Sequence, residues 1–148
     1  MAYSTLDDVM IAAGGARALA ELTDIDGTRS GEVDADVLAS AIADADALID
    51  TYIGRNRAVP LSEPVPQIIR RLSADETVYL LRMRRQMVGD FEQTRHENNL
   101  RWLEGAARGF LTLGVDPQPA KSSLVAPAVQ DVGEDDAEIT AENLKGVW

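Results

Sequence analysis

Apolar residues recur at three- and four-residue steps along most of the chain, which is the spacing of amphipathic α-helices. The clearest repeat predicts a helix over 35–53, where Asp34 can cap the first turn and Gly54 can end the last. Its apolar stripe consists of Val37, Leu38, Ala41, Ile42, Ala45, Leu48, Ile49, Tyr52 and Ile53. Its aspartates fall mainly on the opposite side and are Asp36, Asp44, Asp46 and Asp50. Such a stripe is typical first of a core and second of an interface.

Two shorter helices are predicted ahead of this one. Thr5, with Asp8 three positions later, is typical of a capping-box start for the first helix. The apolar side of that helix is formed by Leu6, Val9, Met10 and Ala13. Glycines at positions 14 and 15 interrupt the repeat, and residues 16–22 predict the second short helix.

The segment 24–34 is rich in aspartate and glycine, which favour tight turns. It superficially resembles a calcium-binding loop, but that template needs glycine at position six and glutamate at position twelve. Counted from Asp24, those positions hold Arg29 and Ala35. We therefore expect a polar loop that ends in a helix cap, and no metal site.

Three prolines, at 60, 64 and 66, predict an extended loop over 55–66, because the residue before a proline avoids helical geometry. A helix is predicted to follow over 66–87. Its apolar side is Ile68, Ile69, Leu72, Val78, Tyr79, Leu80, Met83 and Met87, and its basic side is Arg70, Arg71, Arg82, Arg84 and Arg85. The last predicted helix, 90–113, has a polar first half, which we expect to project into solvent or lie against a partner.

The helical pattern is lost beyond Gly114. Residues 115–148 contain three prolines, an acidic run at 133–138 and few core-type residues before the last five positions. We therefore predict an all-α protein. Residues 1–114 would form a small helical bundle with an extended proline-containing loop, and residues 115–148 a long, largely irregular acidic C-terminal tail, ordered only on binding a partner.

Composition and charge narrow the class further. The chain has 148 residues, of which 45% are apolar and 5% aromatic, which suits one aliphatic helical core. The net charge is −11, but residues 51–114 hold ten arginines against seven acids, whereas residues 1–50 hold eleven acids and two arginines. This pattern fits ordinary solvated helix faces, or head-to-tail contacts between the acidic surface of one copy and the arginines of the next.

No catalytic, cofactor-binding or metal-binding set stands out. The chain has no cysteine, its single histidine, His96, has no second ligand nearby and is expected to be solvent-exposed, and its acid pairs are explained by solvated helix faces. Neither a nucleophile elbow nor a phosphate-binding loop is present. No stretch is as apolar as a signal peptide or a membrane span. We expect no enzyme activity, no cofactor and no membrane contact.

Several stretches resemble, in their order, a family of phage proteins. They are residues 1–9, Leu22-Thr-Asp-Ile-Asp-Gly, the run from Val37 to Tyr52-Ile-Gly-Arg, Val59-Pro-Leu, Pro64-Val-Pro, and Arg101-Trp-Leu-Glu-Gly-Ala-Ala-Arg-Gly with Leu113-Gly-Val-Asp. Over about residues 1–116 the chain resembles the head–tail adaptor, or head-completion, proteins of Mu-like and related tailed phages. None of these stretches is a catalytic signature, so the resemblance rests on their order.

The resemblance implies a structural virion protein of the head–tail junction, made in the cytoplasm of the bacterial host. Its copies would form a homo-oligomeric ring, expected to be twelve-fold, between the portal protein and a downstream neck or tail protein. Genomic DNA would pass through the bore without sequence recognition, since an acidic bore repels DNA and lets it slide.

Candidate contacts follow from the tail and the charges. For the portal contact we expect Leu144, Lys145, Val147 and Trp148, because a terminal tryptophan is a strong anchor when buried in a partner. For the contact between subunits we expect Arg70, Arg71, Arg82, Arg84 and Arg85 with Asp44 and Asp50. Sequence-specific DNA binding is not expected, because acidic residues interrupt the arginines and no aromatic platform accompanies them.

Two other classes remain open at this point. One is a different neck or tail component, such as a stopper or tail terminator, which we expect to be rich in strands. The other is a non-viral helical regulatory protein, which would bind DNA as a dimer. Circular dichroism separates the first class from a helical adaptor, and a gel shift at physiological salt separates the second.

Overall fold

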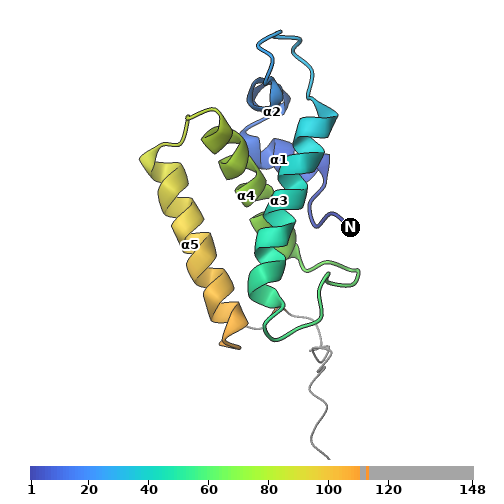
Figure 1. Cartoon of the computed structure of the whole chain (residues 1–148), viewed down its shortest axis with the longest axis vertical. Coiled ribbons are helices and arrows are strands. Elements are labelled where there is room, and N and C mark those ends of the chain that lie inside the picture. Colours follow the sequence, from blue (N-terminus) through green and yellow to red (C-terminus); the bar gives the residue numbers. More distant parts are fainter. Residues whose placement is uncertain (111–112, 114–148) are drawn as a thin grey trace, which may run out of the picture.

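The computed structural model describes residues 1–110 and residue 113 of the chain. Over these residues the chain forms five α-helices and no strand (Figure 1). The helices are α1 (Leu6–Ala13), α2 (Ala16–Thr23), α3 (Ala35–Ile53), α4 (Gln67–Arg84) and α5 (Asp90–Ala107). The prediction of an all-α fold is confirmed, whereas the whole of the predicted tail lies outside the described residues.

Helix α4 lies at the centre of the bundle and contacts each of the other four helices. In Figure 1, α3 and α5 run alongside α4 with their chain direction opposite to its own. Seven consecutive residues of α4, 72–78, are buried. A helix that is enclosed on every side is buried around its whole circumference, so the single apolar side predicted for this segment understates its burial.

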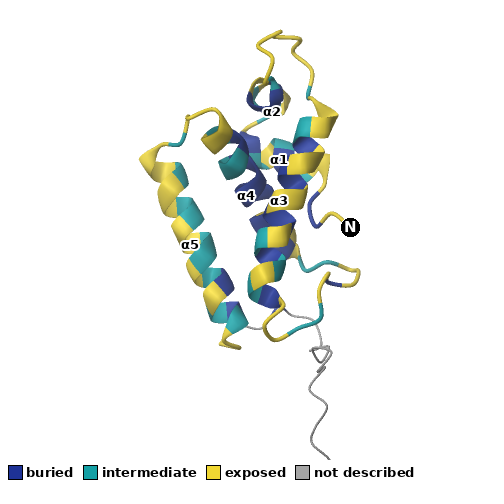
Figure 2. Ribbon diagram, viewed as in Figure 1, coloured by how far each residue is buried: buried dark blue, intermediate teal, exposed yellow. Residues whose placement is uncertain are grey.

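Two apolar clusters fill the bundle, and Figure 2 shows the buried residues concentrated on the inner sides of α3 and α4. The first cluster joins α1 and α2 to the first half of α3 and the second half of α4, through Val9, Ala13, Leu19, Leu22, Leu38, Ala41, Ile42, Ala74, Val78 and Leu81. The second cluster joins the other halves of α3 and α4 to α5, through Tyr3, Ile49, Ile53, Leu61, Ile69, Leu72, Leu103, Ala106 and Leu113. Most of the apolar stripe predicted for α3 is therefore core, as expected.

The predicted helix starts are confirmed in their chemistry. The Thr5 hydroxyl accepts from the backbone N–H of Asp8 at 3.3 Å, and the Asp8 carboxylate accepts from the backbone N–H of Thr5 at 2.9 Å. Asp34 accepts from two backbone N–H groups at the start of α3, each at 3.0 Å. Between α1 and α2, Gly14 adopts φ +94°, a left-handed conformation that ends a helix at little cost only in glycine.

The last two helices end earlier than predicted. Helix α4 ends at Arg84, and Gln86 beyond it has φ +55°. Met83 and Met87, which we predicted on the apolar side of this helix, are exposed, and Leu81 is buried instead. Helix α5 ends at Ala107 instead of continuing to 113. A left-handed Gly109 follows, with φ +78°, which is a common way to end a helix.

The proline-containing segment between α3 and α4 is non-helical, as predicted. It is anchored by Leu61, which is buried in the second cluster. Asn56 at its start donates to the backbone carbonyls of Ala106 and Ala107 at 2.9 and 3.2 Å, and so supplies partners for the open C-terminal end of α5. In the described part of the chain, no helix combines the length and apolarity needed to cross a membrane.

Candidate functional site

The polar residues of greatest interest are buried around α4. Among the described residues, seven polar or charged ones are buried: Ser4, Thr23, Asp46, Ser73, Asp75, Glu76 and Thr77. The expectation that the acidic residues of these helices lie on solvated faces is wrong for Asp46, Asp75 and Glu76. Burying a carboxylate is costly unless hydrogen bonds or opposite charges compensate, so each of the three must have partners.

Asp46 of α3 ties the N-terminal segment to α4. Its Oδ2 accepts from the backbone N–H of Tyr3 at 2.8 Å, and its Oδ1 accepts from the Ser73 hydroxyl at 2.5 Å. The Ser73 hydroxyl also lies 2.8 Å from the Ser4 hydroxyl. Burial raises the pKa of Asp46 above its ordinary value, although the hydrogen bonds from Ser73 and Tyr3 oppose the rise.

Tyr3 continues this network towards the proline-containing loop. Its hydroxyl donates to the Asp50 carboxylate at 2.5 Å and accepts from the backbone N–H of Leu61 at 2.8 Å. Burial, followed by the hydrogen bond to Asp50, raises the pKa of Tyr3 above its ordinary value. Asp50, which we predicted as a contact between subunits, is therefore engaged within its own chain.

Glu76 joins α4 to the polar half of α5. Its carboxylate has no exposed surface and lies 2.6 Å from His96 Nδ1, and it accepts from the Asn99 side chain at 2.9 Å. The His96 ring stacks on Tyr79, with centroids 4.0 Å apart and planes at 3°. The side chain of His96 is only 18% exposed, so the expectation that this histidine is solvent-exposed is wrong.

Asp75 makes a second bridge from α4 to α5. Its carboxylate lies 2.9 Å from Arg95 of α5 and 3.8 Å from Arg71 of its own helix. Burial raises the pKa of Asp75, and the two arginines oppose the rise. The polar half of α5 thus lies against α4 of the same chain. It lacks an apolar stripe because this contact is made by charged and aromatic polar residues.

A buried carboxylate beside an imidazole is also the arrangement used for proton transfer. Here Glu76 is enclosed, and the hollow between α2 and the end of α4 is lined by other side chains. The hydrogen bonds of Glu76 instead join two helices. A spacing of three residues, Glu76 to Tyr79 on one helix and His96 to Asn99 on the next, is the signal by which the sequence could have revealed this pairing.

The arginines predicted as contacts between subunits also have partners within the chain. Arg70 lies 3.0 Å from Asp8 of α1, Arg84 lies 2.7 Å from Asp44 of α3, and Arg82 lies 2.8 Å from Glu92 of α5. Arg85 donates to the backbone carbonyls of Glu21 and Asp24 at the end of α2. These residues fasten α4 to its neighbours, and whether they also bind a second copy stays a prediction.

The predicted contact residues differ in how much of them remains open. The side chain of Arg71 is 71% exposed, that of Asp44 58% and that of Arg70 44%. The side chains of Arg82 and Arg84 are 29% and 34% exposed. A neighbouring subunit would therefore meet Arg71, Asp44 and Arg70 most readily. The predicted portal contacts, Leu144, Lys145, Val147 and Trp148, lie outside the described residues.

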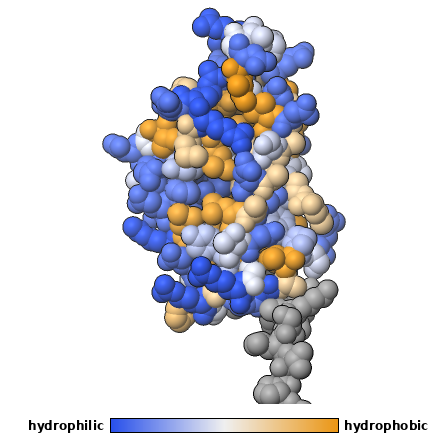
Figure 3. All heavy atoms as spheres, viewed as in Figure 1, coloured by the Kyte–Doolittle hydropathy of each residue, from blue (hydrophilic) through white to orange (hydrophobic). Residues whose placement is uncertain are grey.

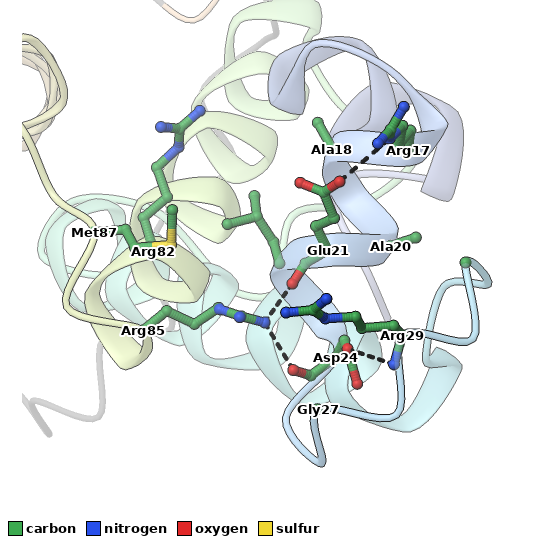
Figure 4. Close-up of a pocket in the computed structure, with 12 residues that line it drawn as sticks. Arg17, Ala18, Ala20, Glu21, Asp24, Gly27, Arg29, Arg82, Arg85 and Met87 are labelled. Atoms are coloured by element: carbon green, nitrogen blue, oxygen red, sulfur yellow. Dashed lines mark hydrogen bonds and ion pairs between the residues drawn. The ribbon is translucent and has the colours of Figure 1, made fainter.

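An open hollow of about 730 Å³ lies between α2, the loop after it and the end of α4 (Figure 4). Its charged lining residues are Arg17, Glu21, Asp24, Arg29, Arg82 and Arg85. Asp24 accepts from the backbone N–H groups of Arg29 and Thr28 at 3.0 and 3.1 Å, and these bonds, the one from Arg29 first, lower its pKa. Asp24 therefore shapes the loop, as the turn-rich sequence predicts.

The rest of the visible surface is mixed. In Figure 3, separate apolar areas lie among hydrophilic residues on the face shown. Large exposed apolar side chains near the join of α4 and α5 are Met83, Met87 and Phe91. Residues 1–110 and 113 contain no group of three or more potential metal ligands, so the described part of the chain offers no candidate metal centre.

Most of the chain, including all five helices, matches a known protein family. A family model described as bacteriophage Mu, Gp36 matches residues 3–130. The match extends past residue 116, where the resemblance recognised in the sequence ended, so the first part of the predicted tail shares the family pattern. No curated protein matches the chain.

Proposed function

The chain belongs to the bacteriophage Mu Gp36 family, and from this premise we propose that it is a structural virion protein whose copies form a ring between the portal and the tail. The match over residues 3–130 is the observation that carries the proposal. The ring completes the head and gives the genome a passage. Its partners are other copies of the chain, the portal protein and the next neck or tail component.

The role we propose is mechanical, without a catalysed reaction. Its support is the use that the described residues make of their polar groups. Asp46, Asp75 and Glu76 each bridge two or more segments of the chain. The four arginines of α4, with Arg85 just beyond its end, fasten it to α1, α2, α3 and α5 or bond within α4 itself. Such a bundle resists deformation, which suits a subunit that transmits load between two parts of a particle.

We propose that the contact between copies is head-to-tail and uses the charges that remain exposed. Arg71 and Arg70 are the open cations of α4, and Asp44 is an open anion of α3. A heterologous contact of this kind closes into a ring when the rotation between copies is right. The excess of acids in residues 1–50 supports an acidic bore, which would repel DNA and let it slide.

The portal contact is proposed for the end of the tail, at Leu144, Lys145, Val147 and Trp148. The test is to mix purified portal rings with the full chain and with a variant that lacks residues 115–148, and to image both by electron microscopy. We expect the full chain to add a layer to the portal and the shortened chain to stay unbound. Circular dichroism of the shortened chain, which should keep the helical signal, is the control for folding.

Two outcomes would count against these proposals in different ways. A shortened chain that still decorates portal rings would refute the portal role of the tail and leave the ring intact. A full chain that stays monomeric and ignores the portal would refute the ring itself. The strand-rich stopper or terminator is disfavoured by the all-helical described residues, and a non-viral DNA-binding protein is disfavoured by the family.

A further inference from the structure

The hollow beside α2 is lined by four arginines and two acidic residues, so its lining carries a net positive charge. Arg17 pairs with Glu21 at 3.3 Å, and Arg82 pairs with Glu92. Arg85 donates its hydrogen bonds to backbone carbonyls and not to a carboxylate, although its charge is near enough to help lower the pKa of Asp24. Arg29 has no carboxylate within ion-pair distance among residues 1–110 and 113.

Figure 4 shows Arg29 and Arg85 reaching towards one another across the hollow, close to Asp24. Asp24 already directs its carboxylate to two backbone N–H groups of its own loop. Two guanidinium groups that face one another repel unless an anion lies between them, and their planar forks match a carboxylate well. The geometry is that of a site for an anionic group that comes from elsewhere.

We propose that the hollow holds the acidic run 133–138 of the same chain. That run carries four carboxylates in six residues: Glu134, Asp135, Asp136 and Glu138. Leu113 is buried in the second cluster, whereas the hollow lies at the end of α4 that belongs to the first. The twenty residues from Leu113 to Gly133 span at most about 70 Å. Helix α4, with its 18 residues, is only about 27 Å long, so the run reaches the hollow.

Other anions are less suitable occupants. A nucleic-acid backbone would have to approach a chain of net charge −11 to reach this one hollow. The acidic run of a second copy competes with a run that is tethered, and a short tether gives an effective concentration in the millimolar range. The inference goes beyond the proposed ring and does not depend on it, because it concerns the free subunit.

The absence of cysteine from the chain permits a clean test by disulfide trapping. In the full-length chain, Ala137→Cys in the acidic run is combined with Ala18→Cys, which lines the hollow, or with Ser62→Cys. Ser62 is exposed and follows Leu61, which belongs to the same apolar cluster as Leu113. A tail with no docking site would therefore meet Ser62→Cys, near its point of attachment, sooner than it would meet Ala18→Cys. We expect the disulfide within one chain to form faster with Ala18→Cys.

Arg29→Gln should slow the trapping at Ala18→Cys by about two- to fivefold, the range expected for exposed ion pairs, and high salt should do the same. Arg101→Gln, on the exposed side of α5, is the matched control and should leave the rate unchanged. Faster trapping at Ser62→Cys, or a rate indifferent to Arg29→Gln, overturns the inference. A disulfide that forms only between two chains also overturns it, and assigns the hollow to a second copy.

Discussion

At the scale of single residues, the most informative feature is a carboxylate buried between three segments. Asp46 accepts from Tyr3 and Ser73, so it organises the N-terminal segment, α3 and α4 at one point. Both of its partners are donors, and removing the carboxylate would leave the Tyr3 N–H without an acceptor in the interior and the Ser73 hydroxyl with Ser4 alone. An unsatisfied buried donor costs more than the hydrogen bond itself contributes.

Replacing Asp46 should therefore have different effects in two variants. Asp46→Ala leaves the Tyr3 N–H unpaired and the Ser73 hydroxyl with Ser4 as its remaining partner, and we expect a loss of about 2–3 kcal/mol in the free energy of unfolding. Asp46→Asn keeps an oxygen for Tyr3 and offers an N–H to Ser73, whose hydroxyl can then donate to Ser4, so we expect a loss below about 1 kcal/mol. Urea denaturation followed by circular dichroism measures both.

The wild type and Asp46→Asn should also differ in how their stability depends on pH. Because the pKa of Asp46 is raised in the fold, its contribution to stability declines as the pH rises from 3.8 through the folded pKa. The amide has no such dependence, so Asp46→Asn should compare better with the wild type at pH 7 than at pH 3. An amide variant that is as unstable as the alanine variant at pH 7 would contradict this account.

Asp8 should behave in the opposite way. The backbone N–H of Thr5, and then its hydroxyl and Arg70, hold the pKa of Asp8 below its ordinary value of 3.8. The stability that Asp8 contributes is therefore present above pH 3.8 and lost as the pH falls through the folded pKa. We expect Asp8→Ala to cost about 1 kcal/mol at pH 7 and clearly less at pH 3.

Asp7→Ala is the matched control for Asp8→Ala. Asp7 is exposed in the same first turn of α1, outside the capping box. It should cost less than about 0.5 kcal/mol at pH 7. Equal losses for the two variants at pH 7, in urea denaturation, would show that the helix end responds to charge alone and that the capping box contributes nothing further.

At the scale of helices, α5 is held by different means along its length. Its second half contributes Leu103 and Ala106 to the second cluster, and Asn56 supplies partners at its end. Its first half is held by Glu76 and Tyr79 through His96 and Asn99, with Asp75 and Arg95 alongside. Detaching this half should therefore require only the loss of a polar contact.

We expect His96→Ala to release the first half of α5. The change removes the ring that stacks on Tyr79 and leaves the buried Glu76 with Asn99 as its remaining partner, at a cost of about 2–4 kcal/mol. Hydrogen exchange should accelerate at residues 91–99 while α3 stays protected. Gln93→Ala, which removes only exposed hydrogen bonds to the Tyr79 hydroxyl and to Glu97, is the control. Unchanged protection of α5 in His96→Ala would contradict the assigned role.

The helices themselves were predictable because their signals are local. The apolar stripe of 35–53 and the caps at Thr5 and Asp34 depend on neighbours in sequence, and all three are confirmed. The predicted end of α4 was wrong because Gln86 takes a left-handed conformation that its residue type does not indicate. The predicted end of α5 was wrong because the left-handed Gly109, which lies inside the predicted helix, marks where the chain leaves the helical conformation.

The buried polar contacts were missed for a different reason. Asp46 and Glu76 look like solvated charges in the sequence, because a helix with one acidic side and one apolar side is normally a surface helix. What buries them is the central place of α4, which depends on the packing of four other helices. The partner of Glu76 lies twenty residues away in sequence, so the hydrophobic pattern of neither helix identifies it, and only the matching three-residue spacings on the two helices point to the pairing.

At the scale of the whole molecule, the proposed ring depends on charges that already serve the single chain. A head-to-tail contact through Arg71 should weaken as salt rises, because exposed ion pairs are screened beyond about 10 Å at 0.1 M salt. Exposed charges are weakly screened at about 50 mM sodium chloride and strongly screened at about 500 mM. Sedimentation velocity at these two concentrations should show the ring giving way to smaller species as the salt rises.

Two variants separate the ring contact from general charge effects. Arg71→Gln should lower the fraction of rings at low salt, because the side chain of Arg71 is 71% exposed. Arg101→Gln removes the same charge from α5 and should leave the ring fraction unchanged. A ring indifferent both to salt and to Arg71→Gln would rule out the charged contact and direct attention to exposed apolar residues such as Met83 and Phe91.

The polar contacts around α4 also have an evolutionary consequence. Apolar residues in the two clusters can be exchanged for others of similar volume with modest loss. A change at Glu76 or at His96 alone should be costly, since it breaks the contact between the buried carboxylate and the partly buried ring. Related proteins that differ at these two positions should therefore differ at both together. Substitutions in the two apolar clusters, in contrast, should occur one residue at a time.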